Sequence, residues 1–355
     1  MKSNVSILLM TMTLLVSSCK PAPQSPTSSA TYHQIKGQTW GTYYSLTLQC
    51  SEAEHHHQAI RQILKDFDDV LSTYVPQSVI SQFNSNSEGI ALTSDQDQYF
   101  APVLARSREL SESTQGYLDV TVMPLLNYWG FGYKGERKSV EDVTTEQVDS
   151  LLMLQGLHHI SRKEKDSGHI YYSKSNASTE LDFSALAKGY GIDVIASYLE
   201  RQDVHNYLID IGGEARCKGV NASGEAWRLA INKPDAKANY TTMELIVQLH
   251  DQSIATSGNY REMYEIDGKV YGHIINPKTG YPEPSDVLSA TIVATDCMTA
   301  DALATACVAA GLHKAKEILA AHEDVHGCLI YDADGDAQLE KYYTGAFEDM
   351  TEIVE

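Results

Sequence analysis

The chain of 355 residues is poor in basic side chains and has no long block of Lys and Arg. It contains 27 Lys and Arg against 47 Asp and Glu, so its formal net charge is −20. Binding to a nucleic-acid backbone needs a positively charged footprint, so nucleic acid is excluded as the expected partner. The hydrophobic content of 43% is ordinary for a folded protein, which excludes a disordered chain and a polytopic membrane protein.

Cysteine is also sparse, and no two cysteines form a C-x-x-C pair. Six cysteines are present, at positions 19, 50, 217, 297, 307 and 328. This spacing indicates neither a disulfide framework nor a zinc site. Cys307 lies in a helix-like run and Cys328 in a strand-like run, so we expect buried free thiols there. His55, His56 and His57 point in different directions around a helix, which favours a solvated helix start over a metal site.

Long apolar runs are absent except at the N-terminus. Residues 5–16 are mostly apolar after Lys2, but a run of this length cannot cross a bilayer, which needs about 20 residues. We therefore interpret residues 1–18 as a signal peptide. Small residues directly before Cys19 are typical of a bacterial lipoprotein, in which this cysteine carries the lipid. The alternative is an ordinary secreted protein. Residues 19–31, rich in Pro, Ser and Thr, read as a flexible tether.

The rest of the chain mixes helical and strand-like periodicity. Helices are predicted for residues 58–71, 99–113, 144–155, 185–200 and 299–310. Strands are predicted for residues 42–49, 170–172, 207–210, 227–231 and 245–249. No repeat, linker or composition break divides residues 32–355. We therefore predict a single mixed α/β domain of the α+β class, with residues 134–149 as an inserted loop and helix.

The most informative pattern is an acidic residue in a helix of small apolar residues. Asp301 and Thr305 are four positions apart in this helix, so both side chains project from the same face. The helix is apolar almost all round and must be buried. Two hard oxygen donors on a buried helix suit Mg²⁺, which completes its shell with water and substrate phosphate. A plain helix cap at Thr299 is the alternative for Asp301, but it does not account for Thr305.

Four further segments join glycines to polar side chains. In residues 182–189, Ser184 is a candidate N-cap, and the small residues of the following helix leave its first amide groups open to a phosphate. Residues 209–213 and 255–259 are strand-like runs that end in turns. In residues 272–281, His273 precedes a turn that contains Pro277 and Gly280. Each segment alone is explained by a tight turn or a structural histidine.

Taken in order, these segments resemble the ApbE family of FAD:protein FMN transferases. The matching segments are residues 40–43, 71–84, 116–121, 124–125, 129–132, 182–189, 211–213, 256–258, 273–280 and 300–305. The resemblance implies an ApbE-type, T-fold-like domain over residues 32–355. It also implies that FAD is the substrate, that Mg²⁺ is the cofactor, and that FMN passes to a Thr or Ser of an acceptor flavoprotein subunit while AMP leaves.

The resemblance also implies roles for individual residues. Asp301 and Thr305, with the carbonyl of Ala185, resemble the metal ligands, and His273 resembles a catalytic base, with Asp301 as a second candidate for that role. The residues that resemble the FAD contacts are Trp40, Tyr74, Leu118, Asp119, Asp182, Lys188, Ser257, Gly258 and His273. Two alternatives stay open, a periplasmic FAD pyrophosphatase and a non-enzymatic FAD-binding lipoprotein. The expected location is the periplasm, with a lipid on Cys19 holding the protein at a bacterial membrane.

Overall fold

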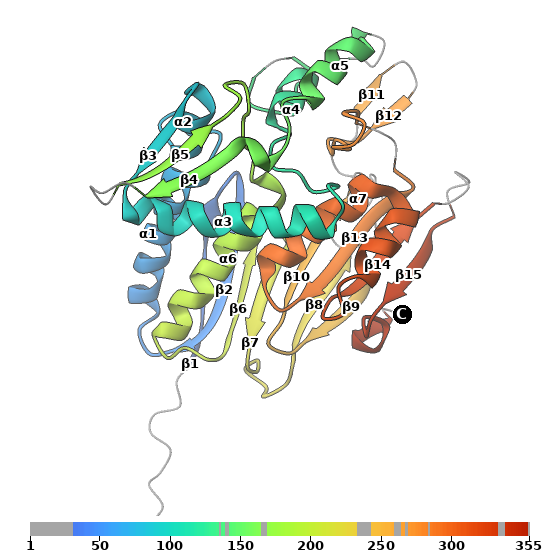
Figure 1. Cartoon of the computed structure of the whole chain (residues 1–355). Coiled ribbons are helices and arrows are strands. Elements are labelled where there is room, and N and C mark those ends of the chain that lie inside the picture. The colour runs from blue at the N-terminus through green and yellow to red at the C-terminus, as the bar shows by residue number, and fades with distance from the viewer. Residues whose placement is uncertain are drawn as a thin grey trace, which may run out of the picture.

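The centre of the molecule is an antiparallel sheet of eight strands in the order β1-β2-β6-β7-β10-β13-β14-β15 (Figure 1). The computed structural model describes residues 31–134, 136–138, 142–164, 169–232, 243–258, 264–266, 269–282, 285–332 and 338–353. The signal peptide predicted for residues 1–18 and all but the last residue of the tether lie outside these residues. The strands are β1 (Thr31–Thr39), β2 (Thr42–Cys50), β6 (Tyr207–Ile211), β7 (Glu214–Lys218), β10 (Ser253–Gly258), β13 (Val287–Ala294), β14 (His326–Tyr331) and β15 (Glu340–Thr344).

One face of this sheet is covered by helices. Helices α1 (Ala53–Leu71), α6 (Ser184–Arg201) and α7 (Cys297–Ala320) lie on the sheet, and α3 (Ser94–Ser113) lies across α6 and α7. The apolar side chains of α1 recur every three or four residues, so they form one stripe that packs against α6 and β2. The first half of α7 is rich in alanine, and these short side chains allow close approach to both α6 and the sheet.

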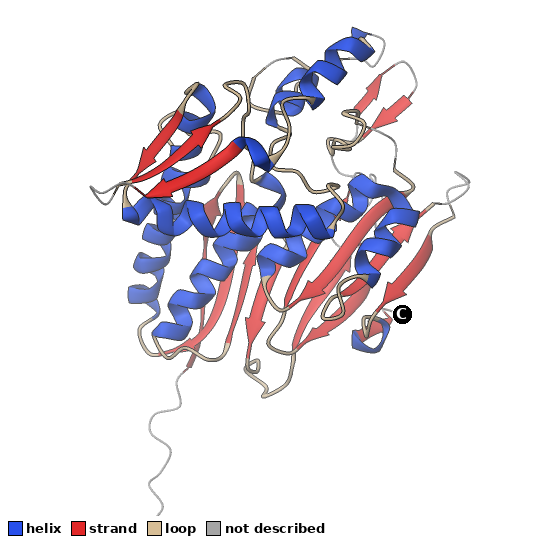
Figure 2. Ribbon diagram, in the orientation of Figure 1, coloured by secondary structure: helices blue, strands red, loops and turns tan. Residues whose placement is uncertain are grey.

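The other face is covered by a second, smaller sheet. Its strands are β8 (Trp227–Asn232), β9 (Met243–Leu249) and β16 (Thr351–Ile353), in the order β16-β9-β8. Their buried side chains meet those of β7, β10, β13 and β14 in a separate apolar cluster. The large sheet is therefore buried on both faces over its central strands, as Figure 2 shows.

A further group of elements lies on the side of α3 away from the large sheet, above α3 in Figure 1. They are α2 (Val79–Ser85), the sheet of β3 (Gly89–Leu92), β5 (Ile170–Lys174) and β4 (Ile160–Glu164), α4 (Met123–Trp129), α5 (Thr145–Leu152), and the hairpin of β11 (Tyr264–Ile266) and β12 (Lys269–Tyr271). Val148 of α5 packs with Trp129 of α4 and with Ile275. The helix predicted within the insertion at residues 134–149 thus exists, and its apolar side faces the segment that follows His273.

The mixed fold predicted from the sequence is confirmed, and each predicted helix and strand matches an observed one. Among the described residues, Cys50, Cys217, Cys297, Cys307 and Cys328 are buried free thiols. None of the helices in these residues has the length and apolarity that a bilayer span requires.

The prediction of a solvated histidine cluster is wrong in part. His56 is only 6% exposed. Its Nδ1 lies 3.2 Å from the hydroxyl of Tyr198, because α1 turns this face toward α6. The helix begins at Ala53, before the predicted residue 58, so the three histidines lie in its first turns.

Candidate active site

The beginning of α7 is held by carboxylates from two directions. Asp296 is the N-cap, and its Oδ1 accepts a hydrogen bond from the backbone N–H of Thr299 at 2.8 Å. The cap is therefore Asp296 and not Thr299, because Thr299 already lies inside the first turn. Asp193 of α6 accepts from the N–H groups of Cys297 at 3.0 Å and Met298 at 2.9 Å. These contacts satisfy amide groups that a helix start leaves free and fix α7 against α6.

Asp301 lies one turn further along α7, between the two helices. Its side chain is 3% exposed, and its Oδ2 accepts a hydrogen bond of 3.0 Å from the backbone N–H of Gly189. A Cβ at residue 189 would lie 2.2 Å from the carbonyl oxygen of Cys297, so only glycine permits this approach. Burial raises the pKa of Asp301 to about 7, against the opposing effect of Lys188, and the carboxylate of Glu214 adds to the rise.

Thr305 projects from the same side of α7 as Asp301. Its Oγ1 lies 3.0 Å from the Oγ of Ser257, which is near the end of β10. Ala185 and Gly189 are four residues apart in α6, so the carbonyl of Ala185 lies next to the N–H of Gly189. That N–H donates a hydrogen bond to Asp301, which places the carbonyl of Ala185 near the Asp301 carboxylate. The structure thus gathers the three predicted metal ligands and Ser257 into one region. Their roles stay predictions.

Lys188 reaches the same region from α6, and its partner is a residue that the sequence analysis missed. The Nζ of Lys188 lies 2.5 Å from Oε1 of Glu214, the first residue of β7. Burial lowers the pKa of Lys188, but the carboxylates of Glu214 and Asp301 outweigh it, and the net shift is upward. The only sequence signal for Glu214 is its place directly after the two glycines at 212 and 213.

A second group of predicted FAD contacts surrounds the beginning of α6. The backbone N–H of Asp182 donates to the carbonyl of Val120 at 2.7 Å, which ties this helix start to the segment of Leu118 and Asp119. Asp182 accepts from both the N–H and the hydroxyl of Ser184. Ser184 is therefore already helical, and the N-cap position belongs to Phe183. The N-cap predicted at Ser184 is wrong because Asp182 holds the turn from two residues upstream.

Trp40 and Tyr74 differ in their surroundings. Trp40 has a φ of 50° at the turn between β1 and β2. Its ring lies against Gly191 of α6, where a Cβ would come within 2.2 Å of it, and 4.9 Å from the ring of Phe67. Tyr74 is 79% exposed. An exposed aromatic ring offers a stacking surface, which suits the role predicted for Tyr74, while Trp40 is mainly part of the packing around α6.

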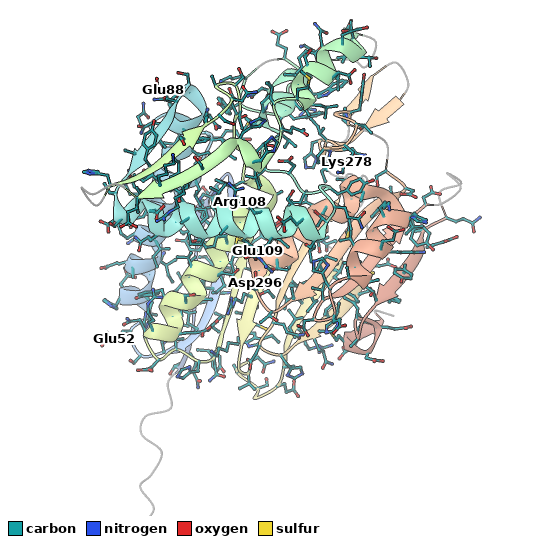
Figure 3. All side chains as sticks on the ribbon, in the orientation of Figure 1. Glu52, Glu88, Arg108, Glu109, Lys278 and Asp296 are labelled. Carbon is teal, nitrogen blue, oxygen red and sulfur yellow. The ribbon has the colours of Figure 1, made fainter. Side chains whose placement is uncertain are left out.

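The segment that carries His273 lies over the end of the first half of α7. His273 is half-buried and follows β12. The turn after it is fixed by the carbonyl of Gly280, which accepts from the indole N–H of Trp129 at 2.7 Å. Lys278 reaches from this turn to Gly116, and it lies on the other side of α3 from Asp296 in the view of Figure 3.

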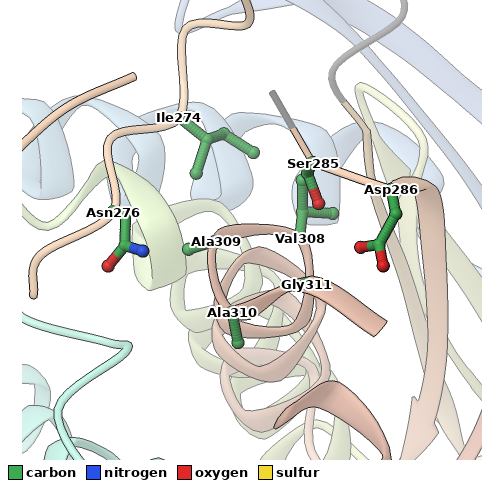
Figure 4. Close-up of a pocket in the computed structure, with 8 residues that line it drawn as sticks. All are labelled: Ile274, Asn276, Ser285, Asp286, Val308, Ala309, Ala310 and Gly311. Atoms are coloured by element: carbon green, nitrogen blue, oxygen red, sulfur yellow. The ribbon is translucent and has the colours of Figure 1, made fainter. Parts of the chain in front are cut away.

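A cavity of about 290 Å³ opens beside this segment. Figure 4 shows its lining, which comes from the His273 segment, from the residues before β13 and from α7: Ile274, Asn276, Ser285, Asp286, Val308, Ala309, Ala310 and Gly311. The helix is interrupted here, because Gly311 has φ 74° and ψ 168°. The N–H of Leu312 restarts the helix by donating to Asp286 at 2.8 Å. The cavity thus begins one helical turn beyond Thr305.

The donors around Asp301 fit a hard divalent cation. They are one buried carboxylate, one hydroxyl and one backbone carbonyl, all oxygens, and Mg²⁺ is commonly held by one or two carboxylates together with water and substrate phosphate. No cluster of three or more His, Cys, Asp or Glu side chains suited to a metal occurs in the described part of the chain. A site of this kind does not need such a cluster.

Comparisons with known proteins agree on one family. A family model described as "ApbE family" matches residues 40–330. A protein of Vibrio cholerae named FAD:protein FMN transferase is 34% identical over 351 residues, which cover 97% of this chain and 98% of that protein. One of Haemophilus influenzae with the same name is 37% identical over 80% of this chain and 82% of its own length. The solved structure of the flavin transferase ApbE from Vibrio cholerae superposes with a TM-score of 0.77 at 33% identity, covering 90% of this chain and 99% of that one.

Proposed function

Because this chain belongs to the ApbE family, we propose that it is an FAD:protein FMN transferase. In this reaction a Thr or Ser hydroxyl of an acceptor flavoprotein attacks the phosphorus of the FMN half of FAD. The new P–O bond is a phosphoester, the bond from that phosphorus to the bridging oxygen breaks, and AMP leaves. The observation that carries the proposal is the buried Asp301 carboxylate, with Lys188 and the Thr305–Ser257 hydroxyl pair in the same region.

We propose Mg²⁺ as the cofactor. Asp301, Thr305 and the carbonyl of Ala185 would hold it, and the carboxylate of Asp301 is buried between α6 and α7, where a cation would compensate its charge. When bound, Mg²⁺ supplies neutralisation of the charge on the pyrophosphate. The ammonium of Lys188 adds a second positive charge from α6, and Ser257 and Gly258 offer hydrogen-bonding groups from the end of β10.

The remaining predicted FAD contacts bind the rings and the ribose. Tyr74 presents an exposed aromatic face, and Trp40 a partly covered one. Asp119 and Asp182 are carboxylates that accept hydrogen bonds from hydroxyl or amino groups. Leu118, which precedes Asp119, is a buried apolar residue. Both carboxylates have a raised pKa because burial disfavours their charged form. Hydrogen-bond donors of FAD would offset that cost.

His273 acts in this account as the general base. Its imidazole takes the proton from the acceptor hydroxyl as the new P–O bond forms, and Asp301 is the second candidate for that role. The cavity lined by Ile274, the residue after His273, offers room for the approaching chain segment of the acceptor.

We also propose that the protein works in the periplasm, anchored by a lipid on Cys19. The support is the sequence pattern of residues 1–19 and the tether that follows it. A tether of this length reaches roughly 40 Å when extended, so the domain can move away from the membrane surface to meet its acceptor.

The test of the function separates transfer from hydrolysis. The protein is incubated with FAD, Mg²⁺ and a candidate acceptor, and AMP and free FMN are quantified by chromatography. Transfer predicts AMP release that depends on the acceptor and little free FMN. Equal amounts of AMP and FMN without an acceptor would instead indicate a pyrophosphatase. Binding of FAD without either product would leave only a flavin-binding protein.

A further inference from the structure

Glu214 is a buried acid at the beginning of β7, next to the predicted metal ligands. It is 4% exposed and begins β7 directly after a two-residue turn of glycines. Gly212 and Gly213 have φ of 68° and 107°, conformations that residues with a side chain rarely adopt. Ile211 pairs with Glu214 across this turn, so the turn brings the carboxylate to the end of the sheet that faces α6.

The two carboxylate oxygens of Glu214 have different surroundings. Oε1 accepts from the ammonium of Lys188 at 2.5 Å. Oε2 is buried and has no hydrogen-bond partner among the residues that the structure describes. A buried carboxylate is costly unless it is paired, so the contact with Lys188 is what stabilises Glu214 in this position.

The same contact fixes Lys188. The side chain of Lys188 is 36% exposed, which leaves space for it to swing toward water, as long basic side chains usually do. The ion pair instead keeps the ammonium over β7. The next residue, Gly189, donates a backbone hydrogen bond to Asp301, so the Lys188 ammonium is held in the region of the predicted metal ligands.

We infer that Glu214 is a positioning residue that holds the Lys188 ammonium where the pyrophosphate of FAD binds. The inference rests on the proposed function and extends it. Glu214 itself does not bind FAD, because a carboxylate repels phosphate. Its role is to restrict Lys188 to one position, so that the positive charge already stands where negative charge develops during transfer.

This role predicts opposite effects on binding and on turnover. Glu214→Gln removes a negative charge near the phosphates, so FAD should bind as tightly as before or more tightly. The released Lys188 samples several positions, so kcat should fall by about tenfold or more. A purely structural role would weaken binding and turnover together and would give no such separation.

A double-mutant cycle tests whether Glu214 acts through Lys188. The variants are Glu214→Gln, Lys188→Met and the double variant, each measured for kcat, for KM of FAD, and for FAD affinity by flavin fluorescence in EDTA. We expect Lys188→Met to lower kcat at least as much as Glu214→Gln. The double variant should be no slower than Lys188→Met, because the second substitution then has nothing left to release.

Asp97 provides a matched control. It is a buried acid, 7% exposed, paired with Arg162 at 2.7 Å between α3 and β4. Asp97→Asn should lower the melting temperature, leave kcat unchanged, and combine additively with Lys188→Met. If Glu214→Gln does not fold, Glu214→Asp takes its place in the cycle, since it keeps the charge but shortens the side chain.

The outcomes distinguish this inference from the function on which it rests. No FMN transfer and no AMP release by the unmodified protein would overturn the proposed function. Transfer by the unmodified protein, with kcat of Glu214→Gln within twofold of it, would overturn only the positioning role. The positioning role would also be overturned if Glu214→Gln lowered kcat equally in the unmodified protein and in Lys188→Met. A rise in the Kd of FAD that matches the fall in kcat would overturn it as well.

Discussion

The backbone N–H of Gly189 on α6 donates a 3.0 Å hydrogen bond to the buried carboxylate of Asp301 on α7. This contact requires the two helices to approach so closely that residue 189 has no room for a side chain. Asp301 is therefore fixed by backbone atoms and not only by other side chains. The rigidity of the α6–α7 contact sets the position of the most important predicted metal ligand.

Substitution of Gly189 tests that contact. In Gly189→Ala the new Cβ would collide with the backbone of Cys297, which cannot move independently of α7. We expect the free energy of unfolding to fall by about 1–3 kcal/mol and the transfer activity to fall with it, as Asp301 shifts. Chemical denaturation and AMP release measure the two effects. Ser197→Ala, at an exposed position of the same helix, is the control and should change neither. Unchanged stability in Gly189→Ala would contradict the packing described.

Loss of the charge at residue 301 should affect stability and activity in opposite directions. Asp301→Asn keeps the shape but removes a buried charge that the fold disfavours, so thermal stability should hold or rise. Mg²⁺ binding should weaken and turnover should fall by orders of magnitude. Thr305→Val should have a smaller effect, because water can replace one neutral ligand. Calorimetric titration with Mg²⁺ and the transfer rate provide the measurements.

Asp296→Asn is the control for that experiment. Asparagine is as good an N-cap as aspartate, so this change, one turn earlier in the same helix, should leave Mg²⁺ affinity and turnover close to those of the unmodified protein. Full activity in EDTA, or normal turnover in Asp301→Asn, would rule out the metal site proposed here.

Removal of the imidazole of His273 should separate binding from chemistry. His273→Ala should still bind FAD, because most of the predicted ring and phosphate contacts lie on other residues, while transfer falls by roughly 10²–10⁴. Flavin fluorescence gives the affinity and single-turnover kinetics give the rate. His250→Ala, at an exposed histidine after β9, should have no effect. A normal transfer rate in His273→Ala would eliminate it as the base.

Because His56 is buried, we expect the folded protein to lose stability in mild acid. Burial chiefly, and also the proximity of His55, lower the pKa of His56 below its ordinary 6.5, although Glu52 opposes the shift. The unfolded chain therefore binds a proton more readily than the folded one, and stability falls as the pH drops through about 6.5. Melting temperatures from about pH 7.5 to about 5.5 should show this slope, and His56→Gln should reduce it. His205→Gln, at an exposed position, should leave the slope unchanged.

The lipid anchor has its own test. Cys19→Ala removes the only predicted site of lipid attachment, so the protein should leave the membrane fraction while FAD affinity and activity persist. Fractionation followed by immunoblotting measures the distribution. A variant that stays with the membrane after a high-salt wash would show that something other than Cys19 holds it there.

The sequence predicted the elements with strong periodicity and missed those without it. The helix predicted for residues 299–310 stops where Gly311 interrupts α7, but its second half could not be foreseen, because Asp286, 26 residues away, restarts it. Strand β13 was missed because nearly all of its residues are buried, including the polar Ser289 and Thr291, so its polar positions do not mark an exposed face.

The candidate site likewise contains residues that were predicted from the sequence and residues that were missed. Asp301 and Thr305 were predicted as metal ligands because a carboxylate and a hydroxyl at helical spacing stand out in an apolar helix. Asp193 and Glu214 were missed because their partners are distant in the chain. Asp193 contacts the beginning of α7, and Glu214 contacts Lys188 on α6. A charged residue within an apolar helix or directly after a pair of glycines is the signal that would have suggested them.

The central claim is that FMN is transferred to a protein. Mass spectrometry of a candidate acceptor, after incubation with this protein, FAD and Mg²⁺, tests it most directly. We expect an acceptor heavier by FMN less one water, with the adduct on a single Thr or Ser, and no adduct when Asp301→Asn replaces the unmodified protein. Free FMN in the same amount as AMP, with every acceptor left unmodified, would contradict it.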